Sequence, residues 1–153
     1  MSQLIDRNWL VAVVGATINK EKYGYRVLIR LGELGYRVVG VNPKYEEIEG
    51  VKCFPSLGAL LDSSSLTQDD KILANDDPAS SRLRGAGNLL VITVVPPEAT
   101  VQVVVECGRL GIKRIWMQVG SESGKAVEIA GELGVEVLGT NCIIVDGLGV
   151  RWG

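Results

Sequence analysis

The stretch Arg37-Val38-Val39-Gly40-Val41-Asn42-Pro43-Lys44 decides the fold of this chain, because an apolar run ends there in a turn. The run has the length and the β-branched content of a strand that is buried on both faces. A segment of helical period precedes it, and an earlier apolar run, Leu10–Val14, precedes that segment. A strand, a helix and a second strand in this order predict a βαβ unit, and therefore a parallel sheet with right-handed crossovers.

A short phrase recurs at three places along the chain and marks the same kind of junction each time. A leucine and a glycine stand before an apolar run at Leu34-Gly35, Leu110-Gly111 and Leu133-Gly134. Glycine after a helix takes the left-handed conformation at little cost. Each phrase therefore predicts the end of a helix and the start of a strand, which indicates a repeated αβ unit rather than a solenoid repeat.

Apolar stripes before these glycines have the spacing of helices that lie on a sheet. The stripes are Val27, Leu28, Leu31 and Leu34; Val103, Val104, Cys107 and Leu110; and Ala126, Ile129, Ala130 and Leu133. We expect the first helix to begin near Tyr23 or Gly24. Pro96-Pro97 opens the second, where proline costs little, and Ser121 is the candidate cap of the third. The predicted strands are Leu10–Val14, Arg37–Val41, Leu89–Val94, Arg114–Met117 and Val135–Leu138, with a short edge strand near Lys52–Phe54.

Together these elements predict an α/β fold, a Rossmann-like three-layer α/β/α domain with a parallel sheet of five to six strands. By analogy with such folds, the expected strand order is 3-2-1-4-5-6. Residues 1–153 fit a single domain with a sizeable core. A polar segment at about 62–88, rich in Ser, Asp and Gly, interrupts the pattern. We expect a flexible surface loop there, with a regulatory or partner-binding insert as the alternative.

Composition and charge argue against several classes of function. The net charge of −2 gives no basic field, so nucleic acid is not an expected partner. No apolar run approaches the roughly 20 residues that cross a bilayer, and the first residues lack the layout of a signal peptide, so we expect a cytoplasmic protein without membrane contact. The three cysteines are widely spaced and suggest neither a disulfide framework nor a zinc site.

The chain contains no histidine. This excludes Ser-His-Asp and Cys-His catalysis, phosphohistidine chemistry and His-ligated metals within the sequence. It also removes the usual general base for reactions near neutral pH. We therefore expect no catalytic residue and no metal site. Whether the chain is an enzyme stays open, with the missing histidine as evidence against it.

The tip of the second strand carries a cation at a position that distinguishes nucleotides. Rossmann-like sheets bind ligands beyond the carboxyl ends of their strands, and this tip usually carries the Asp or Glu that binds the ribose hydroxyls of NAD. Here the tip carries Asn42, Pro43 and Lys44. A cation suits a ribose that bears a phosphate, which coenzyme A and NADP have and NAD lacks. The alternative is a solvated lysine in an ordinary turn.

The loop that begins at Gly15 is a second candidate element. A glycine after the first strand lets backbone N–H groups approach a phosphate, and the N-terminus of the next helix adds positive potential. Thr17 can donate a hydroxyl, and Lys20 or Lys22 can supply charge. Because the loop is not Gly-x-Gly-x-x-Gly, an ordinary tight turn remains the alternative.

The other strand tips add weaker candidates. Val95-Pro96-Pro97 forms a stiff lip that can flank an adenine or a pantetheine arm, although the same prolines can simply start a helix. Gln118 follows the fifth run and can reach the cleft. Asn141 and Cys142 follow the last strand, where the reactive end of a ligand would arrive, but a free cysteine is often just buried.

Taken together, these tips resemble the CoA-binding domain family. That family includes small stand-alone proteins and the N-terminal domain of the succinyl-CoA synthetase α subunit. Five segments in the same order carry the resemblance over most of the chain: Val11–Thr17, Val41–Lys44, Val95–Pro97, Trp116–Gly120 and Gly139–Cys142. The last segment has Thr140 where nucleotide-forming acyl-CoA synthetases have proline.

The resemblance implies roles for several residues. Gly15, Ala16 and Thr17 would approach the pyrophosphate of coenzyme A. Lys44 would face the adenosine 3′-phosphate, and Val95-Pro96 would line the path of the adenine or of pantetheine. The catalytic histidine of the synthetases lies in a further domain, so ligase activity does not come with these motifs.

The leading hypothesis is therefore non-catalytic binding of coenzyme A or an acyl-CoA, for sequestering or sensing the ligand or for presenting it to a partner. One alternative is an NADP-dependent oxidoreductase, in which Tyr23 or Tyr25 would be the proton donor. The other is a protein-interaction module with a degenerate nucleotide pocket, and a protein partner or a homo-oligomer stays open. The candidate ligand-binding residues are Gly15, Ala16, Thr17, Lys20, Tyr23, Asn42, Pro43, Lys44, Val95, Pro96, Pro97, Gln118, Asn141 and Cys142.

Overall fold

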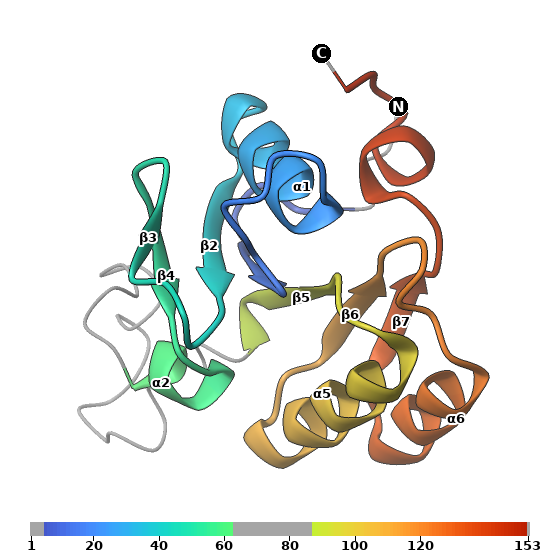
Figure 1. Ribbon diagram of the computed structural model, residues 1–153. Helices are drawn as coiled ribbons and strands as arrows, with labels where there is room; N and C mark the ends of the chain where they lie inside the picture. Colours follow the sequence, from blue (N-terminus) through green and yellow to red (C-terminus); the bar gives the residue numbers. More distant parts are fainter. Residues whose placement is uncertain (1–4, 63–86, 153) are drawn as a thin grey trace.

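The computed structural model describes residues 5–62 and 87–152, and in it a central sheet is covered on both faces (Figure 1). One face carries α1 (Tyr23–Glu33) and the π-helix η1 (Ile143–Gly147); the other carries α2 (Leu57–Leu61), α5 (Pro97–Leu110) and α6 (Gly124–Leu133). The predicted three-layer α/β/α class is therefore confirmed. The predicted insert at about 62–88 lies, apart from its ends, outside the described residues.

Within the described ranges, the sheet has seven strands in the order β3-β4-β2-β1-β5-β6-β7. They are β1 (Leu10–Val14), β2 (Arg37–Val41), β3 (Glu47–Ile48), β4 (Val51–Phe54), β5 (Leu89–Thr93), β6 (Arg114–Met117) and β7 (Glu136–Gly139). Every neighbouring pair is parallel except β3 and β4. Without β3, this is the predicted order 3-2-1-4-5-6. The prediction of five to six strands was one short, because β3 pairs antiparallel with β4 at the edge of the sheet.

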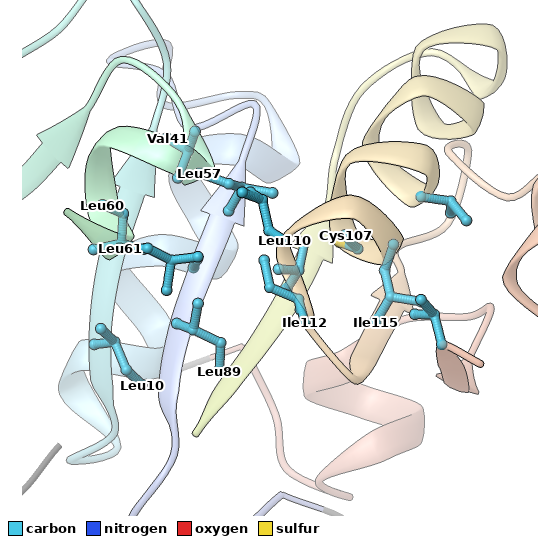
Figure 2. Close-up of a cluster of buried hydrophobic side chains, with 14 of the residues drawn as sticks. Leu10, Val41, Leu57, Leu60, Leu61, Leu89, Cys107, Leu110, Ile112 and Ile115 are labelled. Carbon is cyan, nitrogen blue, oxygen red and sulfur yellow. The ribbon is translucent and has the colours of Figure 1, made fainter. Parts of the chain in front are cut away.

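Two cores form because successive strand residues point to opposite faces. Val91 of β5 belongs to the cluster under α5, whereas its neighbour Ile92 belongs to the cluster under α1. Figure 2 shows the first cluster, in which side chains of α2 and α5 meet those of the strands. Labelled there are Leu10, Val41, Leu57, Leu60, Leu61, Leu89, Cys107, Leu110, Ile112 and Ile115. Burial on both faces explains why the strands read as continuous apolar runs.

The helix boundaries agree with the sequence at most positions. α1 begins at Tyr23, and α5 has Pro96 as its cap and Pro97 as its first residue. The junction glycines all have positive φ, 88° at Gly35, 80° at Gly111 and 74° at Gly134. No helix in 5–62 or 87–152 is long and apolar enough to cross a membrane.

The predicted cap of α6 was wrong. Ser123 caps this helix, and its Oγ accepts a hydrogen bond from the backbone N–H of Ala126 at 3.2 Å. Ser121 is instead buried in the turn between β6 and α6. Two serines stand two residues apart in this turn, so the residue type alone could not separate cap from turn.

Candidate functional site

Two adjacent hollows open at the carboxyl edge of the sheet. The first, here called the α1 cleft, has a volume of about 720 Å³ and lies at the N-terminal end of α1. The second, the α5 cavity, has a volume of about 480 Å³ and is lined by residues that start α2 and by one face of α5. Gly15, Asn42 and Val95 line both hollows. Sheets of this class bind their ligands at this edge.

The structure brings many, but not all, of the predicted residues to these hollows. Those that line one or both are Gly15, Thr17, Tyr23, Asn42, Pro43, Lys44, Val95 and Pro96. Those outside both linings are Ala16, Lys20, Pro97, Gln118, Asn141 and Cys142. Lys22, rather than Lys20, supplies the second lysine of the α1 cleft.

Two close backbone approaches bring the start of α1 against the first loop. Gly15 has φ of 103°, and a Cβ there would lie 2.8 Å from the carbonyl oxygen of Val94. A Cβ on Gly24 would collide with the carbonyl group of Gly15. Any larger residue would clash at either position. This packing therefore requires the two glycines that the sequence has there. As a result, Tyr23 and Gly24, the first residues of α1, line the cleft, and the N–H groups of this first turn have no partner within the helix.

Asn42 fastens the first loop to the tip of β2. Its Nδ2 donates to the carbonyl oxygen of Ala16 at 2.9 Å, and its Oδ1 accepts from the backbone N–H of Lys44 at 2.9 Å. Ala16 is fully buried, and a Cβ on Gly40 would lie 2.9 Å from the Ala16 Cβ. Ala16 therefore presents no side chain to either hollow, and its backbone is held by Asn42.

The charged groups of the α1 cleft are Lys22, Lys44 and Glu21. Lys44 is exposed, so its ammonium group is free to turn toward a ligand in the cleft. The α1 N-terminus adds the positive end of the helix dipole, which attracts anions. The Thr17 hydroxyl accepts from the Asn19 N–H at 3.2 Å and lies 3.4 Å from the Tyr45 hydroxyl. With two lysines against one glutamate, the cleft favours an anion.

A buried polar cluster lies at the tips of β5 and β6. Ser121 is 1% exposed and lines the α1 cleft, and its Oγ lies 2.8 Å from the Gln118 carbonyl oxygen and 2.9 Å from that of Thr93. The Thr93 hydroxyl is also 2.9 Å from Ser121 Oγ. Since the carbonyls only accept, Ser121 donates to one of them, and the Thr93 hydroxyl donates to Ser121. The network fixes the shape of this end of the cleft.

The predicted residues Gln118, Asn141 and Cys142 lie behind this end of the cleft. Gln118 is fully buried, and its Oε1 accepts from the Ile143 N–H at 3.0 Å, which fixes the orientation of its amide. Its Nε2 has no hydrogen-bond partner among residues 5–62 and 87–152. Asn141 accepts through its carbonyl from Trp116 Nε1 at 2.7 Å, and Cys142 is 6% exposed. Asn141 therefore contributes only its backbone carbonyl here, and its side chain is exposed.

An aromatic pair borders the α1 cleft near Tyr23. The rings of Tyr23 and Trp152 stack with centroids 5.8 Å apart. The guanidinium of Arg26 lies over Trp152, 4.3 Å from the ring centroid. Nothing in the sequence pattern linked Trp152 to α1, because the residues in contact are far apart in the sequence.

The α5 cavity has a different chemical character. Most of its wall is apolar and comes from Val14, Val41, Pro43, Pro55, Leu57, Val95, Ala99 and Val103. Its polar side chains are those of Asn42, Ser56, Gln102 and Glu106. Apart from Asn42 and the strand-tip residues, sequence reasoning missed this lining. An apolar cavity beside an anion-attracting cleft is the pattern of a Rossmann-like nucleotide-binding site.

The comparison with known families agrees with this class. Residues 10–147 match the family described as the CoA binding domain. The chain belongs to this family, and the resemblance drawn from the strand tips is confirmed.

Curated relatives cover the same region of longer proteins. The chain is 30% identical over 141 residues to an acetate–CoA ligase (ADP-forming) of Methanocaldococcus jannaschii, which covers 87% of this chain and 17% of the ligase. It is 29% identical over 144 residues to the α subunit of acetate–CoA ligase (ADP-forming) II of Pyrococcus furiosus, with coverage of 87% and 26%. The chain therefore spans about a quarter or less of the length of these relatives.

A solved structure matches this chain over nearly its own full length. A conserved hypothetical protein from Pyrococcus furiosus superimposes with a TM-score of 0.66 at 32% identity, over 88% of this chain and 96% of that chain.

Proposed function

We propose that this chain binds coenzyme A or an acyl-CoA across the carboxyl edge of its sheet. The observation that carries the proposal is that an anion-attracting cleft and an apolar cavity share a wall at Gly15, Asn42 and Val95, next to Lys44. A phosphorylated adenosine needs both environments side by side. Membership of the CoA-binding family supports the same ligand.

The pyrophosphate would lie at the start of α1. There Tyr23 and Gly24, the first residues of α1, line the cleft, and the helix dipole favours negative charge. Lys22 and the Thr17 hydroxyl line the same region and would add donors. Ala16 would contribute only through its backbone, because its side chain is buried.

The two ends of the ligand would leave the pyrophosphate in opposite directions. The adenine would enter the apolar α5 cavity past Pro43 and Val95, with the 3′-phosphate of its ribose facing Lys44. The pantetheine arm would follow the α1 cleft past Pro96 toward Gly120 and Ser121. In this arrangement Lys44 distinguishes coenzyme A from nucleotides that lack a ribose phosphate.

We propose binding rather than catalysis at these hollows. The chain has no histidine, and no cysteine is among the described residues that line the two hollows. The curated relatives are named as ADP-forming acetate–CoA ligases, but the chain matches only 17% and 26% of the two compared above. We therefore propose that this segment holds the ligand and that any chemistry on the thiol end requires groups from another domain or protein.

Titration calorimetry with coenzyme A, NADP and NAD tests the proposal. We expect coenzyme A to bind at a ratio of one to one, and more tightly than either dinucleotide. Tighter binding of NADP would instead favour an oxidoreductase. Failure of all three to bind would contradict the proposal and favour a protein-interaction module.

A further inference from the structure

Resting on this proposed function, we propose that Glu106 selects the purine base of the ligand by accepting a hydrogen bond from a 6-amino group. Among residues 5–62 and 87–152, Glu106 is the one carboxylate that lines the α5 cavity. Base recognition at the 6-position would select adenine over hypoxanthine, which carries a carbonyl oxygen there.

The position of Glu106 follows from the geometry of α5. Ala99, Gln102, Val103 and Glu106 have the spacing that places side chains on one face of a helix, and all of them line the cavity. At a rise of about 1.5 Å per residue, Glu106 lies about 10 Å further along α5 than Ala99. Ala99 is close to the strand tip at Val95, where the ribose would sit. Glu106 therefore faces the edge of the base that points away from the sugar, and this edge carries the 6-substituent of a purine.

One oxygen of the Glu106 carboxylate has a hydrogen-bond partner, and the other is available for a ligand. Its Oε2 pairs with Arg109 Nη2 at 3.2 Å, and Arg109 does not line the cavity. Among the described residues, Oε1 has no hydrogen-bond donor assigned to it. This surface ion pair engages one oxygen, and the other oxygen has lone pairs available for a ligand.

The chemistry of a carboxylate gives the selection its direction. An ionised carboxylate only accepts hydrogen bonds, so opposite the 6-position it favours the amino group of adenine and opposes the carbonyl oxygen of hypoxanthine. Hypoxanthine would offer a donor only if the base shifted to bring its N1–H to the carboxylate. The other polar side chains that can reach a base, Gln102 and Ser56, can both donate and accept. They can adapt to either purine and therefore do not discriminate. The selection between adenine and hypoxanthine is therefore assigned to Glu106.

The test compares the binding of coenzyme A with that of its analogue in which hypoxanthine replaces adenine. For the wild-type chain we expect calorimetry to give a preference of about tenfold or more for coenzyme A, the low end for a hydrogen bond to a charged group. Glu106→Gln should reduce this preference to about threefold or less, because the amide can also donate to the oxo group. Glu98→Gln, the same change on an exposed residue of α5 outside the cavity lining, should keep the wild-type preference.

The outcomes separate this inference from the proposed function. A wild-type chain that binds coenzyme A but shows equal affinity for the analogue would overturn base selection and leave coenzyme A binding intact. An unchanged preference in Glu106→Gln would remove the role from Glu106. Failure of the wild-type chain to bind coenzyme A would overturn both. Thermal unfolding of each variant checks that it is folded, and we expect it to be, since the Glu106 side chain is 36% exposed.

Discussion

At the scale of single residues, we propose that Lys44 provides the selectivity for a phosphorylated ribose. Lys44→Glu should weaken coenzyme A binding by about tenfold or more, because it removes a charged hydrogen bond to the 3′-phosphate and adds repulsion. Dephospho-coenzyme A, which lacks that phosphate, should lose much less affinity. Calorimetry with the two ligands measures the difference.

A matched control is available on the opposite edge of the sheet. Lys113 is exposed and directly precedes β6, at the amino ends of the strands. Lys113→Glu makes the same change of net charge far from both hollows and should leave both affinities unchanged. Equal losses for the two ligands in Lys44→Glu would show that the lysine does not face the 3′-phosphate.

The buried thiol of Cys107 should make the stability of the fold depend on pH in the alkaline range. Burial, with a smaller contribution from the negative charge of Glu106, raises the pKa of Cys107 from 9.0 to about 12. Above pH 9 the unfolded chain loses this proton while the folded chain keeps it, so the free energy of unfolding should fall by about 1.4 kcal/mol per pH unit up to about pH 12. Urea unfolding at pH 8, 10 and 11, values chosen to bracket the unfolded pKa at roughly 9, measures the slope.

Cys107→Ala isolates this contribution, since all other titrating groups are shared with the wild-type chain. The variant should be less stable at neutral pH, because Cys107 is fully buried, but its stability should fall less steeply above pH 9. Parallel pH curves for the two proteins would show that the thiol is not responsible.

The sequence predicted those site residues that directly follow a strand. Lys44, Asn42 and Gly15 follow directly from the strands that end beside them, and all three line the hollows. The direction of a side chain at a tip was not predictable, and Ala16 turns into the core. Glu106 could not be predicted either. In the sequence, a glutamate two turns into a helix looks the same whether it lines a cavity or faces solvent.

At the scale of elements, the packing of α1 on the first loop controls the cleft. Gly24→Ala should destabilise the fold by about 1–3 kcal/mol, because the new methyl group would meet the backbone carbonyl of Gly15 and push the helix away. The same displacement should weaken coenzyme A binding. Urea unfolding and calorimetry measure the two effects.

Gly32→Ala is the matched control on the same helix. Gly32 is exposed, and a Cβ there would meet only Val38 Cγ1 at 3.8 Å, an ordinary contact. This substitution should stabilise α1 by about 0.5–1 kcal/mol and leave ligand affinity unchanged. If Gly24→Ala behaved like Gly32→Ala, the close approach of α1 to the loop would be wrong.

Elements with a clear period were predictable, and the shortest ones were not. β1, β2 and β6 occur at their predicted bounds, and α1 and α5 begin where expected. β3 has 2 residues, α2 has 5 and η1 has 5, too few for a period to repeat. These elements form because tertiary packing holds them; Leu57, Leu60 and Leu61 of α2, for example, are buried in the core of Figure 2. Two of the residues that start α2, Ser56 and Leu57, also line the α5 cavity, which is why that cavity was missed.

At the scale of the whole molecule, a ligand that bridges the two hollows should stabilise the fold. Coenzyme A at one hundred times its dissociation constant should add about 2.7 kcal/mol to the free energy of unfolding. For a domain of this size, that corresponds to a rise in Tm of about 5–10 °C. Thermal unfolding with coenzyme A and with NAD, at equal concentrations, measures it. A rise of the same size with NAD would contradict selection by Lys44.

The layers of the fold explain why both hollows meet at one edge. All the parallel strands end at the same edge, α1 covers one face there and α5 the other, and β1 stands between them (Figure 1). The α1 cleft and the α5 cavity therefore lie on the two sides of the β1 tip and share Gly15. A ligand with a charged centre and two arms matches this geometry.

A crystal structure of the chain grown with coenzyme A is the most direct test of this placement. We expect electron density for the pyrophosphate beside Gly15 and the first turn of α1, with the adenine in the α5 cavity and the 3′-phosphate within reach of Lys44. Coenzyme A bound anywhere other than this edge, or bound here with its adenine outside the α5 cavity, would contradict the proposed binding mode.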